Sequence, residues 1–270
     1  MKIFKTLKSE YLFLTILFIR LIYISFQHES IIVSYIPDDS FYYLELAKNF
    51  IETKSWTFDK VNPASGFHTL YAYLIVIIML AIGADNFLSI FLTVSILNII
   101  LFFISFLITK RLVSEYHKIN GNSFMNYLLL IPYLSFFSIN NSTYIMEAPF
   151  TIFFSSQLIF LLFTKKSIPL KLILIFIVCF LGQLFRYDFG LHTLASLIYF
   201  IGYFIKNKKI IYKFLIPILG SSIALFIQIL HNFLYGISFP PSSSLVKSYW
   251  ASTTTLIYDI KEVLEVIIRD

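Results

Sequence analysis

Residues 87–109 read FLSIFLTVSILNIILFFISFLIT, and this stretch contains no charged side chain. About 20 consecutive apolar residues are enough for an α-helix to cross the hydrocarbon core of a bilayer. Further apolar runs flank this one along the chain. They cover 11–27, 68–84, 124–138, 148–164, 170–185, 189–205 and 214–235. The pattern predicts an all-α, polytopic membrane helix bundle.

The composition of the whole chain agrees with a membrane protein. Of its 270 residues 58% are apolar and only 13% are charged, and the mean hydropathy is +0.81. A soluble domain has about 25% charged residues, because polar side chains must cover its surface. The single cysteine, Cys179, excludes an internal disulfide framework and a cysteine-based metal cluster.

The positions of Lys and Arg predict which loops face the cytoplasm. Basic residues gather in four segments, at Lys2/Lys5/Lys8, Lys110/Arg111/Lys118, Lys165/Lys166/Lys171 and Lys206/Lys208/Lys209/Lys213. Cytoplasmic loops of membrane proteins carry an excess of such residues. We therefore expect the N-terminus in the cytoplasm and the other loops on the outer side. These outer loops are 28–67, 139–147, 186–188 and 236–250.

The number of crossings must be reconciled with this topology. Two apolar runs lie between the outer segment 28–67 and the cytoplasmic segment 110–123, but only an odd number of crossings can separate opposite sides. The run 68–84 is barely long enough to span, so we assign it to a surface-lying or re-entrant helix on the outer side. About seven crossings then remain.

No internal repeat or low-complexity linker divides the chain. We predict a single transmembrane domain covering 1–270, in which 28–84 forms the outer loop with its surface or re-entrant helices. The tail 251–270 mixes charged and apolar residues and is predicted to lie at the membrane interface rather than to span. Arg20, inside the first apolar run, is expected to snorkel to the surface or to pair with a carboxylate.

The longest polar stretch, 28–67, contains two adjacent acids, Asp38 and Asp39, directly after Pro37. Apolar residues at helical spacing predict a short surface helix from about 39 to 53. One interpretation is that the acids cap this helix and offset its dipole. The other is that one of them is a catalytic carboxylate at the membrane–water boundary, able to take a proton from an acceptor hydroxyl.

A resemblance to a known family rests on this loop. It reads Asp38-Asp39-Ser40-Phe41-Tyr42-Tyr43-Leu44, then Ala47-Lys48-Asn49, Trp56-Thr57-Phe58-Asp59, Asn62-Pro63 and Gly66-Phe67-His68. The string resembles the first outer loop of GT-C-fold membrane glycosyltransferases, above all bacterial relatives of the protein O-mannosyltransferases and the lipid A aminoarabinose transferases. Three later strings resemble the same family. They are Tyr144-Ile145-Met146-Glu147-Ala148, Leu184-Phe185-Arg186-Tyr187-Asp188 and Phe239-Pro240-Pro241-Ser242-Ser243 with Lys247-Ser248.

The resemblance implies an enzyme at the outer face of a bacterial inner or plasma membrane. Such an enzyme transfers a sugar from a polyprenyl-phosphate carrier to a hydroxyl of a glycan, lipid or protein, with inversion. Asp38 or Asp39 is then the base. Some members of the family use a divalent metal, for which Glu147 and Asp39 are the candidate ligands. Relatives commonly run well beyond 270 residues, so the resemblance implies a minimal or C-terminally truncated member.

Further candidate site residues lie in the other outer segments. Glu147 is either an ordinary loop acid or a second acidic group that places the acceptor or a divalent ion. Arg186 and Asp188 form either a structural ion pair or a grip on the carrier phosphate, because a charged pair at membrane depth is costly. Lys247 is a solvated loop lysine or a second phosphate contact, and His68 is an interfacial anchor or a contact to phosphate or acceptor.

Several other functional classes can be weighed against this one. The chain has no Walker loop, dinucleotide turn or nucleophile elbow, and its cytoplasmic loops are too short for a nucleotide-binding domain. A nucleotide-sugar donor and a nucleic-acid partner are therefore not expected. A lipid or sugar-lipid flippase or transporter is the alternative, although the repeated halves typical of transporters are missing. A degenerate accessory membrane subunit is the third class.

Overall fold

The computed structural model describes residues 9–117, 132–133, 135, 140, 142–164, 168–207 and 215–237. Within these ranges every regular element is a helix, and one isolated β-bridge joins Thr57 to Pro63. The α-helices are α1 (Ser9–Ser25), α2 (Glu29–Tyr35), α3 (Asp38–Thr53), α4 (Thr69–Ile82), α5 (Phe87–His117), α9 (Ala148–Phe163), α10 (Ile168–Phe185), α11 (Gly190–Asn207) and α12 (Leu215–Leu234), with a short 3-10 helix, η2 (Tyr187–Phe189), before α11.

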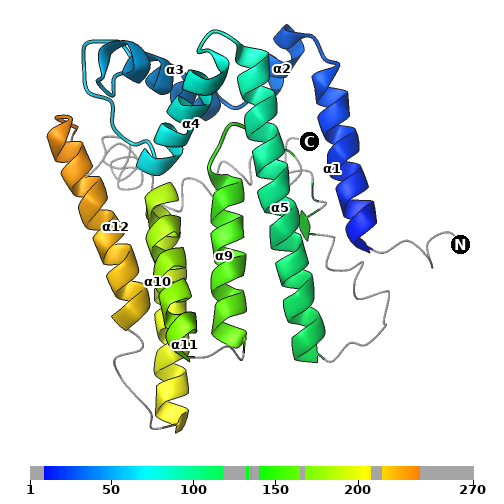
Figure 1. The fold of residues 1–270 in the computed structure, drawn as a ribbon, viewed down its shortest axis with the longest axis vertical. Helices are drawn as coiled ribbons and strands as arrows, with labels where there is room; N and C mark the ends of the chain where they lie inside the picture. The colour runs from blue at the N-terminus through cyan, green and yellow to red at the C-terminus, as the bar shows by residue number, and fades with distance from the viewer. Residues whose placement is uncertain are drawn as a thin grey trace, which may run out of the picture.

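The helices form a bundle that is covered at one end (Figure 1). The helices α1, α5, α9, α10, α11 and α12 run along the long axis, whereas α2, α3 and α4 gather at the upper end of the view. We call that end the capped end. The closest packing joins α10 to α12, α5 to α9, and α9 to α10, and α3 lies on α4. The all-helical prediction is confirmed for the described residues.

Two glycines allow other elements to approach closely, one between α10 and α12 and one between α10 and η2. A Cβ added at Gly220 of α12 would lie 2.7 Å from the backbone oxygen of Phe176 in α10, so only glycine permits this approach. Likewise, a Cβ at Gly182 would lie 2.5 Å from the ring of Phe189. The second contact packs η2 against α10, and so it fixes the short connection that carries Arg186 and Asp188.

The first helix is held on α5 by aromatic side chains and by an ion pair. The Phe13 ring lies 4.8 Å from the Phe106 ring, centroid to centroid, and both side chains are fully buried. At the end of α1 opposite to the capped end, Glu10 Oε2 lies 2.5 Å from Lys110 Nζ. Because these contacts fix α1 along its length, its last turns and Arg20 have a defined place beside α5.

Two described helices are long and apolar enough to cross a membrane, Phe87–Val113 within α5 and Leu215–Leu234, which is α12. Only 39% and 28% of their apolar windows are buried inside the protein. The core helix of a soluble protein is mostly buried, so these helices turn much apolar surface outward. On α12 the exposed Leu219, Phe226 and Phe233 recur every seven residues along one face. Shorter apolar helices lie at Thr69–Ile82, Ala148–Phe163 and Pro169–Phe185.

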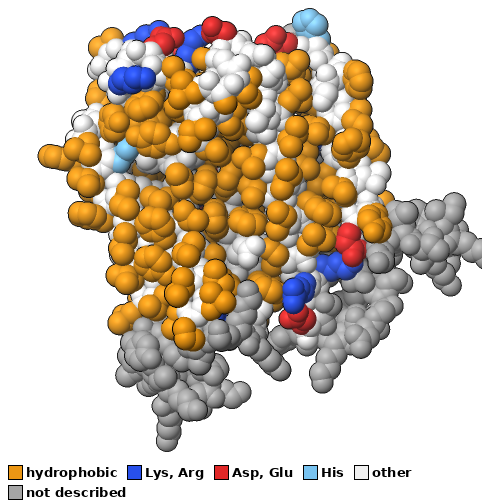
Figure 2. All heavy atoms as spheres, viewed as in Figure 1, with side chains coloured by type: hydrophobic (Ala, Val, Ile, Leu, Met, Phe, Trp, Pro, Cys, Tyr) orange, Lys and Arg blue, Asp and Glu red, His pale blue; other side chains and the backbone are white. Residues whose placement is uncertain are grey.

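The surface has the polarity expected beside a bilayer. Figure 2 shows apolar side chains across the middle of one face, with Lys, Arg, Asp and Glu gathered toward its upper and lower ends. Such a wide apolar surface is rare on soluble monomers and marks contact with a membrane or another protein. The coarse prediction of a helical protein with membrane-crossing helices is therefore supported, and the number of crossings stays a prediction.

The outer-loop helix agrees closely with the sequence prediction. The predicted range of about 39 to 53 becomes α3, Asp38–Thr53, with Pro37 at its N-cap. Its buried surface is wider than one apolar stripe, because α4 covers one side and the segment after α3 covers another. Asn49, which is fully buried, donates from Nδ2 to the carbonyl oxygens of Thr57 and Phe58. The short helix α2 was not predicted.

Three other predicted segments differ in how much of them the structure describes. The apolar run 68–84 contains α4, which runs obliquely at the capped end and buries Tyr71, Ala72 and Ile75 completely. The predicted crossing at 124–138 lies outside the described residues except for 132, 133 and 135. The tail 251–270 lies outside them entirely.

Candidate functional site

Three helix starts meet at the capped end and bring four predicted site residues together. His68 is the N-cap of α4, Glu147 is the N-cap of α9, and Arg186 is the N-cap of η2. Asp188 lies within η2. We call His68, Glu147, Arg186 and Asp188 the acid–base cluster. Helix starts carry unpaired backbone N–H groups and a partial positive charge, so their meeting point favours a carboxylate or another anion.

Glu147 lies at the centre of the acid–base cluster. Its Oε1 is 3.3 Å from His68 Nε2 and 3.7 Å from Arg186 Nη1, and its side chain is only 5% exposed. Its other oxygen, Oε2, is buried and accepts no hydrogen bond from any described residue. A buried carboxylate oxygen without a donor is costly. The Tyr43 hydroxyl lies beside the Glu147 side chain and is the described donor available to it.

The charge state of Glu147 follows from its neighbours. Burial raises the pKa of the Glu147 carboxyl, but the hydrogen bond from His68 and the positive charge of Arg186 outweigh it and lower that pKa below its ordinary value of 4.5. Glu147 is therefore ionised at neutral pH. An ionised carboxylate can accept a hydrogen bond or a proton from a substrate hydroxyl.

The orientation of His68 is fixed from both sides. The Tyr187 backbone N–H donates to His68 Nδ1 over 3.3 Å, so the proton of the neutral ring is assigned to Nε2, which faces Glu147. The His68 backbone N–H donates to the Tyr43 hydroxyl over 3.2 Å. Tyr43 thus connects α3 to the acid–base cluster. Burial, and then the charge of Glu147, raise the pKa of the Tyr43 phenol well above its ordinary value.

Arg186 forms the ion pair that one of the sequence interpretations expected. Its Nε lies 2.8 Å from Asp188 Oδ1, although the approach is not aligned as a hydrogen bond. Side-chain exposure is 32% for Arg186 and 55% for Asp188. The guanidinium therefore lies at the rim of the cluster between two carboxylates, where it remains accessible to a ligand from outside.

Asp38 and Asp39 lie in the first turn of α3 and are both exposed. No side chain caps this helix by a hydrogen bond, so the capping interpretation is not realised in that form. A favourable interaction with the helix dipole remains. Neither carboxylate forms an ion pair or hydrogen bond with another described residue. Asp39 precedes Tyr43 by one helical turn, which places it on the side of α3 that leads to the acid–base cluster.

The structure does not bring all predicted site residues together. Lys247 lies outside the described residues. Among the residues that are described, no three His, Cys, Asp or Glu side chains gather as metal ligands. Glu147, one of the two candidate ligands, is engaged by His68 and Arg186, and a metal site with Asp39 stays a prediction.

Two contributors were not predicted, Tyr43 and the backbone of Tyr187. Tyr43 was visible in the sequence as the residue one turn after Asp39, but its buried hydroxyl gave no signal of its own. The role of Tyr187 depends on an N–H group, and every residue except proline has one. Only the folded chain could identify it.

Comparisons with known proteins add no family to this description. No model of a protein family, no curated protein and no solved structure matches the chain. The resemblance to GT-C-fold glycosyltransferases therefore rests on the short motifs quoted above and stays a prediction.

Proposed function

We propose that this protein is a multi-pass membrane glycosyltransferase. It would move a sugar from a polyprenyl-phosphate carrier to an acceptor hydroxyl at the outer membrane face, with inversion. The proposal includes about seven crossings, formed by the six long helices and the run 124–138. The outward apolar surface and the two long apolar helices support a membrane location. The basic residues near the opposite end of the bundle support an outer location for the capped end.

One observation carries the proposal: Glu147, His68 and Arg186 come from three separate loops and converge at the end where Asp38 and Asp39 begin α3. A charged cluster at the edge of an apolar bundle is costly to build and is usually functional. Here it combines a carboxylate that can bind a hydroxyl with a guanidinium that can bind a phosphate. Glycosyl transfer from a lipid phosphate needs both.

The proposed reaction follows from these groups. The acceptor hydroxyl binds at the exposed rim of the cluster, which Glu147 holds in place, and gives its proton to Asp38 or Asp39 as its oxygen attacks the anomeric carbon. The bond from that carbon to the carrier phosphate breaks in the same step, and the electron pair leaves with the phosphate oxygen. Arg186 holds the leaving phosphate, because a bidentate guanidinium suits its oxygens. A single displacement inverts the configuration and needs no covalent enzyme intermediate.

Radiolabelled transfer tests the proposal. The purified protein in liposomes would receive a panel of labelled polyprenyl-phosphate sugars and an acceptor extract. We expect transfer by the original sequence, and a fall of about 10²-fold or more in Asp38→Asn or Asp39→Asn, whichever removes the base. Glu147→Gln should also lose most of its activity.

Asp59→Asn is the matched control. Asp59 belongs to the same outer loop and accepts through Oδ1 from the backbone N–H groups of Val61 and Asn62. An asparagine keeps the Oδ1 acceptor of both backbone bonds and loses only the bond that Asn62 Nδ2 donates to Oδ2, so the variant removes one carboxylate and keeps the backbone bonds of the turn. Equal transfer in both Asp variants would move the base elsewhere. No transfer from any lipid-linked donor by a folded protein would contradict the proposal.

A further inference from the structure

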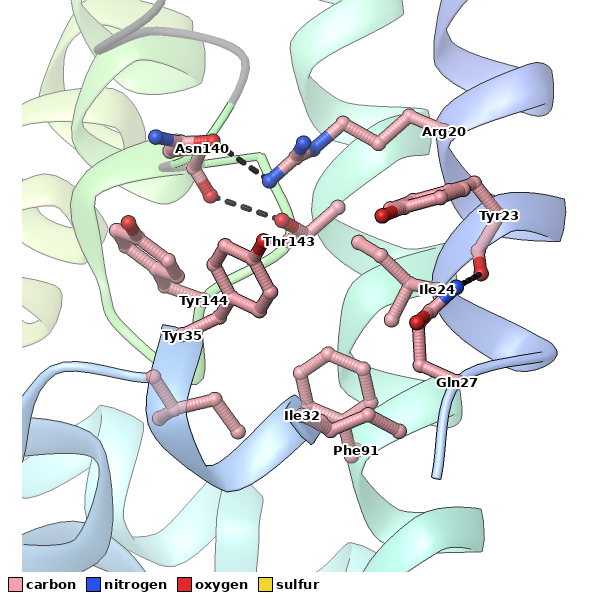
Figure 3. Close-up of a pocket in the computed structure, with 11 residues that line it drawn as sticks. Arg20, Tyr23, Ile24, Gln27, Ile32, Tyr35, Phe91, Asn140, Thr143 and Tyr144 are labelled. Carbon is pink, nitrogen blue, oxygen red and sulfur yellow. Dashed lines mark hydrogen bonds between the residues drawn. The ribbon is translucent and has the colours of Figure 1, made fainter. Parts of the chain in front are cut away.

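A second polar region lies away from the acid–base cluster, in a cavity of about 170 Å³ at the capped end. Its walls come from the end of α1, from α2, from α5 and from the segment before α9, as Figure 3 shows. One water molecule occupies about 30 Å³ in the liquid, so the cavity can admit a polyatomic group. We call it the Arg20 cavity, after the cation that extends from α1 into it.

Among the residues that the structure describes, none places an opposite charge beside Arg20. Its Nη2 donates to the side-chain oxygen of Asn140 over 2.6 Å, which is a neutral acceptor. Its Nε is buried and has no described hydrogen-bond partner. No carboxylate of the described residues lies within ion-pair distance of it. A partly buried cation without a counter-charge is unfavourable, so the sequence prediction of a carboxylate partner is not met here and the cavity favours an anionic occupant.

Three phenol groups line the same cavity. Tyr23 and Tyr35 come from α1 and α2, and Tyr144 comes from the segment before α9. Figure 3 shows the rings of Tyr23 and Tyr35 on two sides of the space below the guanidinium, and the ring of Tyr144 beyond that of Tyr35. Phenol hydroxyls donate hydrogen bonds, and a guanidinium presents several donors in one plane. This set matches a group with several acceptor oxygens, such as a phosphate.

The remaining walls are apolar. Ile24, Ile32 and Phe91 line the side of the cavity opposite to the guanidinium. An inorganic ion would gain nothing from these side chains, whereas the first carbons of an alkyl chain would be buried by them. The combination of one cation, three phenols and an apolar wall fits a phosphate that carries a hydrocarbon chain.

We infer that the Arg20 cavity binds the phosphate group of an amphiphile, held by Arg20 and the surrounding tyrosine hydroxyls. The inference does not depend on glycosyl transfer, because binding can occur whether or not a sugar is moved. The same segment serves both regions, since Tyr144 lines the cavity and Glu147 follows three residues later. Asn98 of α5 fixes this segment by donating to the Tyr144 carbonyl oxygen over 2.7 Å.

Equilibrium binding to the purified full chain in a maltoside detergent tests the inference. The probes are radiolabelled hexadecyl phosphate, unlabelled hexadecanol and inorganic phosphate. We expect the original sequence to bind hexadecyl phosphate and Arg20→Gln to bind it about tenfold more weakly or worse, which is the loss of one charge-assisted hydrogen bond. Hexadecanol should not compete. Competition by inorganic phosphate at equal concentration would identify the free anion, rather than a lipid, as the ligand and overturn the amphiphile assignment.

Two further variants keep the test decisive. Arg111→Gln removes an exposed arginine near the opposite end of α5 and should bind as the original sequence does. Tyr144→Phe keeps the charge of Arg20 and should weaken binding by a smaller factor, about threefold to tenfold. That variant decides the matter if Arg20→Gln does not fold. Unchanged binding of hexadecyl phosphate in folded Arg20→Gln overturns the inference. If Arg20→Gln does not fold, unchanged binding in Tyr144→Phe overturns it, and so does competition by hexadecanol at equal concentration.

Discussion

The two arginines at the capped end differ in what balances their charge. Arg186 lies between Glu147 and Asp188, whereas Arg20 donates to the neutral Asn140. Within the described residues, therefore, carboxylates balance the charge of Arg186, and none balances that of Arg20. An arginine paired with carboxylates keeps their charge balanced in the folded protein. A partly buried arginine without a counter-charge lowers the stability of the folded protein unless an anion is bound. Three measurements test this difference.

The largest expected difference is between Arg186→Gln and Arg20→Gln. Removing Arg186 leaves Glu147 buried with less positive charge near it, and we expect a loss of about 2–4 kcal/mol in the free energy of unfolding. Removing Arg20 also removes its hydrogen bond to Asn140, but it relieves a charge that no described carboxylate balances, so its net effect should stay within about 1 kcal/mol. Thermal unfolding in detergent measures both, and equal losses would show that the two arginines are balanced in the same way.

The pH dependence of stability provides the second test. The pKa of Glu147 is lower in the folded protein than its ordinary value of 4.5, so the native state favours the ionised form. Its contribution to stability is complete above about pH 4.5 and is lost as the pH falls through the lower, folded pKa. Unfolding midpoints measured from pH 6 downward should therefore fall in this window.

Glu147→Gln is the comparison for that experiment, because glutamine does not titrate. Its pH profile should be flatter than that of the original sequence in the acid range. Arg20→Gln should keep the original slope, since the groups that lower the pKa of Glu147 are His68 and Arg186. Parallel profiles for Glu147→Gln and the original sequence would contradict the assigned charge of Glu147.

The smallest effect is expected for Tyr43→Phe. This variant deletes the hydroxyl that accepts from the His68 backbone N–H and keeps the buried ring against Tyr71. We expect a loss of about 1 kcal/mol in the free energy of unfolding. Tyr42→Phe, which removes a hydroxyl bonded to the Ser65 carbonyl in the same region, is the control. Hexadecyl phosphate binding should be unchanged in both variants, and a change in binding would mean either that the probe also binds Arg186 or that the cluster and the Arg20 cavity are coupled.

The sequence could predict the local parts of this arrangement. Pro37 and the apolar spacing after it predicted α3 to within one residue, because helix starts depend on neighbouring residues. The candidate residues His68, Glu147, Arg186 and Asp188 could be found because charged or polar groups beside apolar runs are conspicuous.

Their convergence could not be predicted from the residues themselves. His68 and Tyr187 are 119 positions apart and meet through a backbone N–H and a ring nitrogen. Neither atom leaves a sequence pattern. Arg20 raises the same difficulty, because its partner Asn140 lies 120 positions away in the sequence. Nothing in the sequence distinguishes this asparagine from the other polar side chains that could accept a hydrogen bond from Arg20. Long-range pairing depends on how the helices pack, and only the fold decides that.

The loop between α3 and α4 closes on itself. The Ala64 backbone N–H donates to the Trp56 carbonyl oxygen over 2.8 Å, and Asp59 holds the turn between them. Contacts between residues so near in sequence cost little chain entropy and form quickly. Pulse-labelled hydrogen exchange during refolding should therefore find the Ala64 amide protected before the Tyr187 amide, whose bond to His68 spans 119 residues. During synthesis, the acidic residues ahead of this loop can reach their native positions before Arg186 has been translated.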